Sequence, residues 1–330
     1  MPRPGLKHAS LALRLSGLLV FPALFLFSRG TIADAIDAMR SANVGFLVAA
    51  TALMLGASIV RAMRWRILAE ASGIYYPQFI DYLSIYYAGL FLGAAVPQLA
   101  ASFAPVVLMT EDGHSWRRSG VSIFFDRVVE TLAILLVAFF AALYLIPDYQ
   151  RLSAIVLAVS GSAFAGMAVA VWLLAKAPGL LERVERGPLA RLRKVTDTLQ
   201  SDEARAIFAG LRSRAGQLVV LSITVVLFQV GVVVLLAEAL SLDASIIFLA
   251  AVAAMVVLVV MVPISFAGLG SREAILVVLF TAAGEPKDAA VALGVLLFVV
   301  GLVARLPGAL GWLRRSRPAP VVGLDPAPRA

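Results

Sequence analysis

The sequence contains no cysteine, which excludes disulfides, iron–sulfur clusters and thiolate zinc sites. Its two histidines, His8 and His114, lie far apart in the chain, so they offer almost no material for a histidine metal site or a Ser–His nucleophilic pair. Charge is also scarce: only 15% of the 330 residues are charged, whereas a soluble domain has about 25%. We therefore expect no metal and no other cofactor.

Apolar residues are abundant instead, at 61% of the chain. They fall in long runs that are nearly free of charge, as expected of segments that satisfy their backbone hydrogen bonds inside lipid. This pattern predicts an all-α fold, a polytopic transmembrane helical bundle of about eight spans. The clearest predicted spans are Leu11–Phe27, Val44–Val60, Val121–Ile146, Ala154–Ala175, Leu218–Leu240, Ile246–Val262 and Ala289–Leu313.

Two further apolar segments are interrupted by proline and glycine. Phe79–Met109 is predicted to enter and leave the membrane on the cytoplasmic side, as a re-entrant hairpin, and Val262–Phe280 to cross once as a broken span. Paired broken segments often mark a binding site at the interface of an inverted repeat, although no residue-level repeat accompanies them here. The interrupting residues are Gly89, Gly93, Pro97 and Pro105 in the first segment and Pro263, Gly268 and Gly270 in the second.

The basic residues indicate how the bundle is oriented. They are concentrated near the N-terminus, at residues 61–66, in a loop at 176–215 that holds nine of them, and in the C-terminal tail. The other short loops have a net charge of about zero or below, and this alternation predicts that both termini are cytoplasmic. The net charge of +8 therefore reflects topology and anionic lipid headgroups, and we expect no nucleic-acid partner.

The loop at 176–215 divides a single transmembrane domain, residues 1–316, into halves at 1–175 and 216–316. Apolar residues recur in the loop at helical spacing with basic residues between them. This indicates either an amphipathic helix on the cytoplasmic leaflet or a solvated linker helix. The tail at 317–330 is expected to be disordered. The recurring apolar residues of the loop are Leu189, Leu192, Val195 and Leu199.

Charged side chains at membrane depth are unfavourable, by about 2.5–3.5 kcal/mol each on insertion scales, and therefore need an explanation. Asp126 and Glu130 are four residues apart and share a helical face, while Arg127 precedes Glu130 by three residues and can pair with it. This group indicates either a helix end anchored at the membrane interface or a polar cluster that faces a cavity.

A second group follows the proline and glycines of the Val262–Phe280 segment. With the backbone freed around Gly268 and Gly270, a new helix that starts near Ser271 would place its N-terminal amides beside Arg272. Such a helix start is a suitable site for a phosphate or a carboxylate. The alternative is a tight loop in which Arg272 and Glu273 pair with each other.

The remaining polar residues have simpler explanations. Arg64, with Trp65 and Arg66, is typical of a cytoplasmic interface anchor, or else its guanidinium contacts lipid phosphates. Arg305, near the inner end of the last span, is explained by snorkelling to the interface. Gln229, in mid-span, is expected to form a hydrogen bond between helices.

Three of these stretches together resemble the transmembrane region of the lysylphosphatidylglycerol synthase family, also described as flippase-like. They are Arg64-Trp65-Arg66-Ile67-Leu68, Ser122-Ile123-Phe124-Phe125-Asp126-Arg127, and the run from Pro263 through Gly268-Leu269-Gly270-Ser271-Arg272-Glu273. The resemblance covers residues 45–313 and implies a helical bundle in a plasma membrane, the bacterial inner membrane, that translocates aminoacylated phospholipid or acts in related lipid pathways. One departure is Pro105, which stands where the family has an arginine.

These observations lead to the hypothesis that the protein moves an anionic or zwitterionic phospholipid or isoprenoid lipid between leaflets. The alternative is a non-transporting membrane subunit that presents a lipid-linked substrate to a partner transferase. An enzyme is not expected, because no Ser–His pair or paired aspartates are visible within the spans, although carboxylates such as Asp126 keep acid–base chemistry open. The lipid-binding candidates are Arg64, Asp126, Arg127, Glu130, Gly268, Gly270, Ser271, Arg272 and Glu273.

Overall fold

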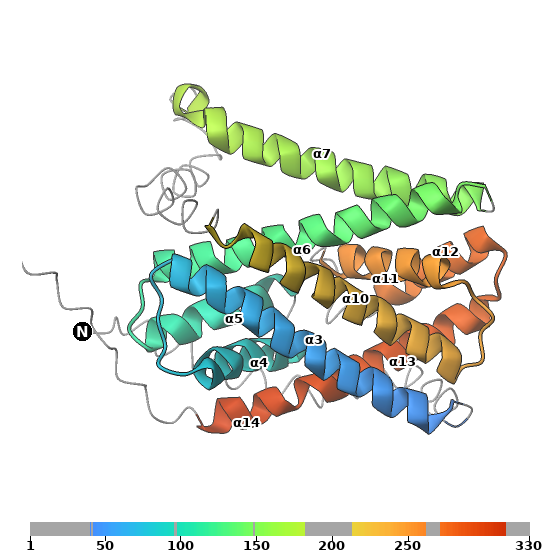
Figure 1. The fold of residues 1–330 in the computed structure, drawn as a ribbon, viewed down its shortest axis with the longest axis horizontal. Coiled ribbons are helices and arrows are strands. Elements are labelled where there is room, and N and C mark those ends of the chain that lie inside the picture. The colour runs from blue at the N-terminus through green and yellow to red at the C-terminus, as the bar shows by residue number, and fades with distance from the viewer. Residues whose placement is uncertain are drawn as a thin grey trace, which may run out of the picture.

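The computed structural model of the protein describes residues 40, 42–95, 98–147, 149–181, 213–261 and 271–314. Within these ranges the chain is helical and contains no strand, which confirms the predicted fold class (Figure 1). The predicted first span, the apolar repeat at 189–199 and the C-terminal tail lie outside the described residues. The helices are α3 (Val44–Ala71), α4 (Phe79–Ala95), α5 (Gln98–Glu111), α6 (Trp116–Leu145), α7 (Gln150–Leu181), α10 (Ala215–Ala239), α11 (Ile246–Met261), α12 (Ser271–Ala283), α13 (Lys287–Arg305) and α14 (Pro307–Arg314).

Several helices are long and apolar enough to cross a membrane, and they make the chain a multi-pass membrane protein. They are α3, α6, α10 and the stretch Lys287–Leu310, which runs from α13 into α14. At about 1.5 Å per residue, the 28 residues of α3 extend about 42 Å, more than the roughly 30 Å of a hydrocarbon core. The helix continues from its predicted end at Val60 to Ala71, so the basic residues at 61–66 lie inside it.

The helices α3 and α10 form an antiparallel pair that lies side by side across the bundle (Figure 1). At one end the backbone N–H of Asn43 donates to the carbonyl oxygen of Ala239 at 3.0 Å. At the other end Arg214 Nη1 donates to Oε2 of Glu70 at 3.0 Å. Because α3 comes from the first half of the chain and α10 from the second, this pair joins the two halves.

The segment formed by α4 and α5 is the predicted hairpin. The hydroxyl of Tyr76, just before α4, donates to Oδ2 of Asp112, just after α5, at 2.8 Å, so the segment begins and ends on one side. Its helices have 17 and 14 residues and are both shorter than a membrane span. The prediction was wrong about Gly89, Gly93 and Pro105, which lie inside α4 and α5 and interrupt neither helix. The Pro105 ring instead packs closely against Gly89, and α4 ends at Ala95.

The helices α11 and α12 flank the second interrupted segment. They have 16 and 13 residues, or about 24 and 20 Å, so both are shorter than the spanning helices. Residues 262–270, with Pro263, Gly268 and Gly270, lie outside the described residues. The helix α12 is described from Ser271 onward; because the residues before it lie outside the described ranges, the restart near Ser271 stays a prediction.

An aromatic cluster positions α4 against α3 and α6. The side chain of Trp65 on α3 is 0% exposed, and its ring centroid lies 5.9 Å from that of Tyr82 and 6.4 Å from that of Tyr86. Trp65 Nε1 also donates to Oγ of Ser122 on α6 at 3.4 Å. A tryptophan at this depth joins three helices and does not anchor the chain at the membrane surface.

Gly308 marks the close approach of α14 to α4 and gives a test of the packing. In Gly308→Ala, the added methyl group would collide with the carbonyl oxygen of Tyr87 and lie 2.7 Å from Cβ of Phe91. Because backbone atoms cannot easily move aside, we expect the variant to lose about 1–3 kcal/mol of stability, measured as a lower Tm in detergent. Gly161→Ala is the control, since no atom lies within 4 Å of its added carbon. Equal Tm values for the two variants would contradict the contact.

Candidate functional site

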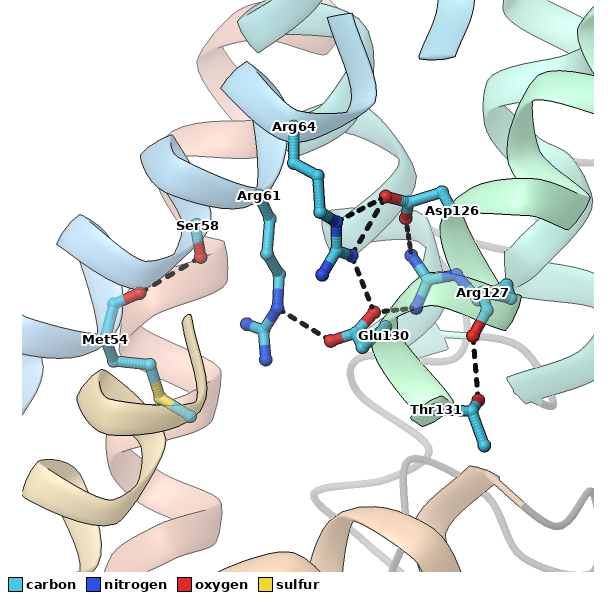
Figure 2. A network of polar contacts seen from close by, with 8 residues as sticks. All are labelled: Met54, Ser58, Arg61, Arg64, Asp126, Arg127, Glu130 and Thr131. Atoms are coloured by element: carbon cyan, nitrogen blue, oxygen red, sulfur yellow. Dashed lines mark hydrogen bonds and ion pairs between the residues drawn. The ribbon is translucent and has the colours of Figure 1, made fainter. Parts of the chain in front are cut away.

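Three arginines and two carboxylates form an ion network between α3 and α6 (Figure 2). Arg64 Nη2 lies 2.9 Å from Oδ1 of Asp126 and 3.3 Å from Oε2 of Glu130. Arg61 Nε donates to Oε1 of Glu130 at 2.9 Å. Arg127 bridges the carboxylates, with Nη2 3.2 Å from Oδ2 of Asp126 and Nη1 3.0 Å from Oε2 of Glu130. Every oxygen atom of the two carboxylates is therefore engaged by a guanidinium.

Residue spacing on the two helices brings this network together. Asp126 and Glu130 are four residues apart on α6, and Arg61 and Arg64 are three apart on α3, so each pair lies on one helical face. The side chains of Arg64 and Asp126 are 0% exposed and that of Glu130 is 3% exposed. An interface anchor keeps its charged end in water. The structure therefore contradicts the anchor interpretation of Arg64, and it places Asp126 and Glu130 in a buried cluster.

A cavity of about 190 Å³ lies beside the network, where the two halves of the chain meet. Residues of α3, α4, α6, α10, α11, α12 and α13 line it, so the helices next to both interrupted segments contribute. The cluster on α6 and the start of α12 thus open into one cavity. Its lining residues are Met54, Ala57, Arg61, Tyr86, Leu90, Arg127, Glu130, Gln229, Val232, Val233, Ala253, Val256, Val257, Val260, Arg272, Leu297, Gly301 and Arg305.

The cavity combines cationic and apolar surface. Four arginines and one glutamate supply its charges, whereas the residues of α11 that line it are all alanine or valine. Arginine binds phosphate and carboxylate groups through paired N–H donors. In the part of the chain that the structure describes, no group of three His, Cys, Asp or Glu residues could hold a metal ion. The arrangement is suited to an amphiphile with an anionic group.

Arg305 and Arg61 present guanidinium groups to this cavity. No hydrogen bond or ion pair joins Arg305 to any residue that the structure describes, and Arg272 and Arg61 lie close enough to repel it. Arg61 uses Nε in its hydrogen bond to Glu130 (Figure 2), and its two terminal nitrogens form no hydrogen bond with a described residue. Arg305 is half-buried and lines the cavity together with other cations, so it belongs to the candidate site.

The sequence-predicted site residues fall into four groups. Arg127, Glu130 and Arg272 line the cavity, and the Arg272 residue is 8% exposed. Arg64 and Asp126 do not line it and lie within the network behind it. Ser271 and Glu273 flank Arg272 on α12, and Glu273 approaches Gly294 of α13. Gly268 and Gly270 lie outside the described residues, so their proposed role stays a prediction.

Four polar residues of the cavity were not among the predicted site residues: Arg61, Tyr86, Gln229 and Arg305. Gln229 lines the cavity and forms no hydrogen bond with another described residue, so its predicted interhelical hydrogen bond stays a prediction. Two features of the sequence could have indicated some of these residues: the mid-span position of Gln229 and the three-residue spacing of Arg61 and Arg64. Nothing in the sequence places Tyr86 beside Arg127, because that proximity depends on how the hairpin packs.

Comparison with known families gives one match. The family model described as "Lysylphosphatidylglycerol synthase TM region" matches residues 10–308. The matched region is more than half of the chain and contains every residue that lines the cavity. Comparisons with curated proteins and with solved structures return no match.

The ion network predicts that Arg64 is far more important for stability than its neighbour Arg66. Arg64→Ala leaves the buried Asp126 carboxylate short of a partner, and breaking a buried pair costs about 3–5 kcal/mol. Arg66, whose side chain is 46% exposed, pairs with Glu70 on its own helix and lies 5.6 Å from the ring centroid of Tyr82, and we expect Arg66→Ala to cost about 1 kcal/mol. Thermal unfolding in detergent measures both variants.

The double variant Arg64→Ala/Asp126→Ala provides the internal check. Removing both partners should recover part of the stability that Arg64→Ala alone loses, because no uncompensated carboxylate remains. If the double variant is less stable by the full sum of the single losses, the two side chains do not interact as the geometry indicates.

Proposed function

The chain belongs to the lysylphosphatidylglycerol synthase TM region family, and on that premise we propose that it moves a phosphate-bearing membrane lipid between the two leaflets. The observation that carries the proposal is a cavity between the two halves of the chain whose lining is both cationic and apolar. A lipid has the same two parts, an anionic phosphate group and hydrocarbon chains. Family membership makes a lipid-related role the expected one.

The size of the cavity supports binding of the headgroup alone. Its volume of about 190 Å³ lies below the roughly 300–1,000 Å³ of a pocket for a drug-sized ligand. A lipid headgroup with its phosphate can occupy such a space, while the acyl or isoprenoid chains remain against the apolar helices and the bilayer. Arginine suits this task because its planar guanidinium forms two parallel hydrogen bonds with phosphate oxygens.

The arginines of the site have different roles in this proposal. Arg272 and Arg305 hold the phosphate, and the terminal nitrogens of Arg61 complete the site. The carboxylates Asp126 and Glu130 balance arginines, which favours this role over contact with a cationic part of the headgroup. The proposal assigns no catalytic step to any of these residues.

We also propose that the protein lies in the bacterial inner membrane with both termini cytoplasmic. Four basic residues support this orientation: Arg66, Arg117, Arg118 and Arg214 lie at the end of the bundle where α3 finishes and α6 and α10 begin. Basic residues prefer the cytoplasmic side of a membrane. A lipid-modifying enzyme of that membrane is the partner that the alternative role requires.

Arg272→Ala should abolish translocation while leaving membrane insertion and expression intact. The measurement is a leaflet-specific lipid-labelling assay in liposomes that contain the purified protein, with Arg66→Ala as a control outside the cavity. Arg272→Lys should retain partial activity, because lysine keeps the charge but loses the paired donors.

Unchanged translocation by Arg272→Ala would remove Arg272 from the site. If the wild-type protein binds lipid but moves none, and a transferase co-purifies with it, the protein is instead a subunit that presents a lipid-linked substrate.

A further inference from the structure

We propose that the cavity selects a headgroup with net negative charge and rejects headgroups that carry an amine. This inference rests on the lipid role proposed above and names the class of lipid. It is not implied by the family description, since lysylphosphatidylglycerol itself carries amines. It follows from which charged atoms of the cavity are already engaged and which are available.

The two carboxylates of the ion network, Asp126 and Glu130, are saturated by arginines. Glu130 is the only acidic residue among the described residues of the lining, and its Oε1 accepts from Arg61 while its Oε2 lies within 3.3 Å of both Arg64 and Arg127. Asp126, the next carboxylate, is 0% exposed and is engaged by Arg64 and Arg127. To pair with either of these two carboxylates, a headgroup ammonium would have to displace a guanidinium from a buried pair, which is unfavourable.

Cations exceed anions in the cavity. The lining holds four arginines and one glutamate, and cations remain in excess when Arg64, Asp126 and Glu273 behind the lining are included. Arg305, Arg272 and Arg61 come from three different helices, α13, α12 and α3, and their like charges repel. An anion placed among them relieves this repulsion in surroundings where charge is poorly screened.

The available donors match the oxygens of an anion. Arg305 forms no bond to a described residue, and the terminal nitrogens of Arg61 form no hydrogen bond with one either. Two guanidinium groups therefore offer paired N–H donors to one small space. Free phosphate offers the same oxygens as a lipid phosphate. The alanines and valines that α11 contributes favour a lipid, since they provide no partner for a hydrated ion.

The test uses purified full-length protein in nanodiscs that contain phosphatidylglycerol, phosphatidylethanolamine and an aminoacylated, cationic phosphatidylglycerol in equal amounts, all with the same acyl chains. Native mass spectrometry then identifies the lipids that stay bound on release. We expect phosphatidylglycerol to be enriched about tenfold over phosphatidylethanolamine and the cationic lipid to be depleted. A tenfold ratio corresponds to the free energy of about one charge-assisted hydrogen bond gained or lost.

Variants of Arg305 test whether the cavity causes the selection. Arg305→Gln should abolish most of the enrichment, and Arg305→Lys should retain it in part. Arg151→Gln removes the same charge from an exposed position on α7 and should retain the full enrichment. A Tm measured for each variant identifies any loss of folding, in which case the Arg305→Lys comparison decides.

A competition experiment with inorganic phosphate distinguishes a lipid phosphate from free phosphate as the ligand of the cavity. Phosphate added to the wild-type protein in millimolar amounts should not displace the bound phosphatidylglycerol if a lipid is the ligand. Full displacement, with a rise in Tm from phosphate alone, would show that the cavity takes a free ion and would overturn the inference.

Failure of the inference and failure of the proposed function give different results. Equal retention of the three lipids, or enrichment unchanged in Arg305→Gln, contradicts headgroup selection even if lipids are still translocated. Selective binding of phosphatidylglycerol without movement between leaflets contradicts translocation and leaves the headgroup selection standing.

Discussion

The interior of this helical bundle holds more arginines than carboxylates, and an unpaired cation is costly wherever hydrocarbon excludes water. Asp126 and Glu130 stabilise Arg64, Arg127 and Nε of Arg61. Arg305 has no such anion among the described residues, yet it lines the same cavity. The proposed site and its preference for an anionic headgroup both follow from this imbalance.

The elements that depend on local sequence could be predicted. The apolar runs predicted the helices, and the shared face of Asp126 and Glu130 predicted a polar cluster. The resemblance to the family is confirmed over residues 10–308. Whether Arg272 binds a lipid remains a prediction, because position on a cavity wall is not evidence of a ligand.

Features that depend on pairing between distant helices could not be predicted. A hydropathy pattern counts each charged residue as unfavourable and does not show whether it has a partner. The predicted span therefore ends at Val60, before the arginines whose charge is neutralised by carboxylates of α6. The bond from Arg61 to Glu130 joins residues 69 positions apart, and no spacing rule relates them. Arg305 was assigned to the interface because its distance from the end of the last span is short, whereas α13 continues into α14 and places it beside the cavity.

The two halves of the chain contribute differently to the site. The first supplies the ion network that positions Arg61 and Arg127, and the second supplies Arg272 and Arg305.

An experimental structure of the protein in nanodiscs of phosphatidylglycerol is the most direct test of the proposed headgroup site. We expect density for a lipid phosphate within hydrogen-bonding distance of Arg272 and Arg305, with Asp126 and Glu130 still paired to arginines. Lipid phosphates found only at the outer surfaces, with Arg305 paired to a carboxylate of the protein, would contradict the anionic headgroup site.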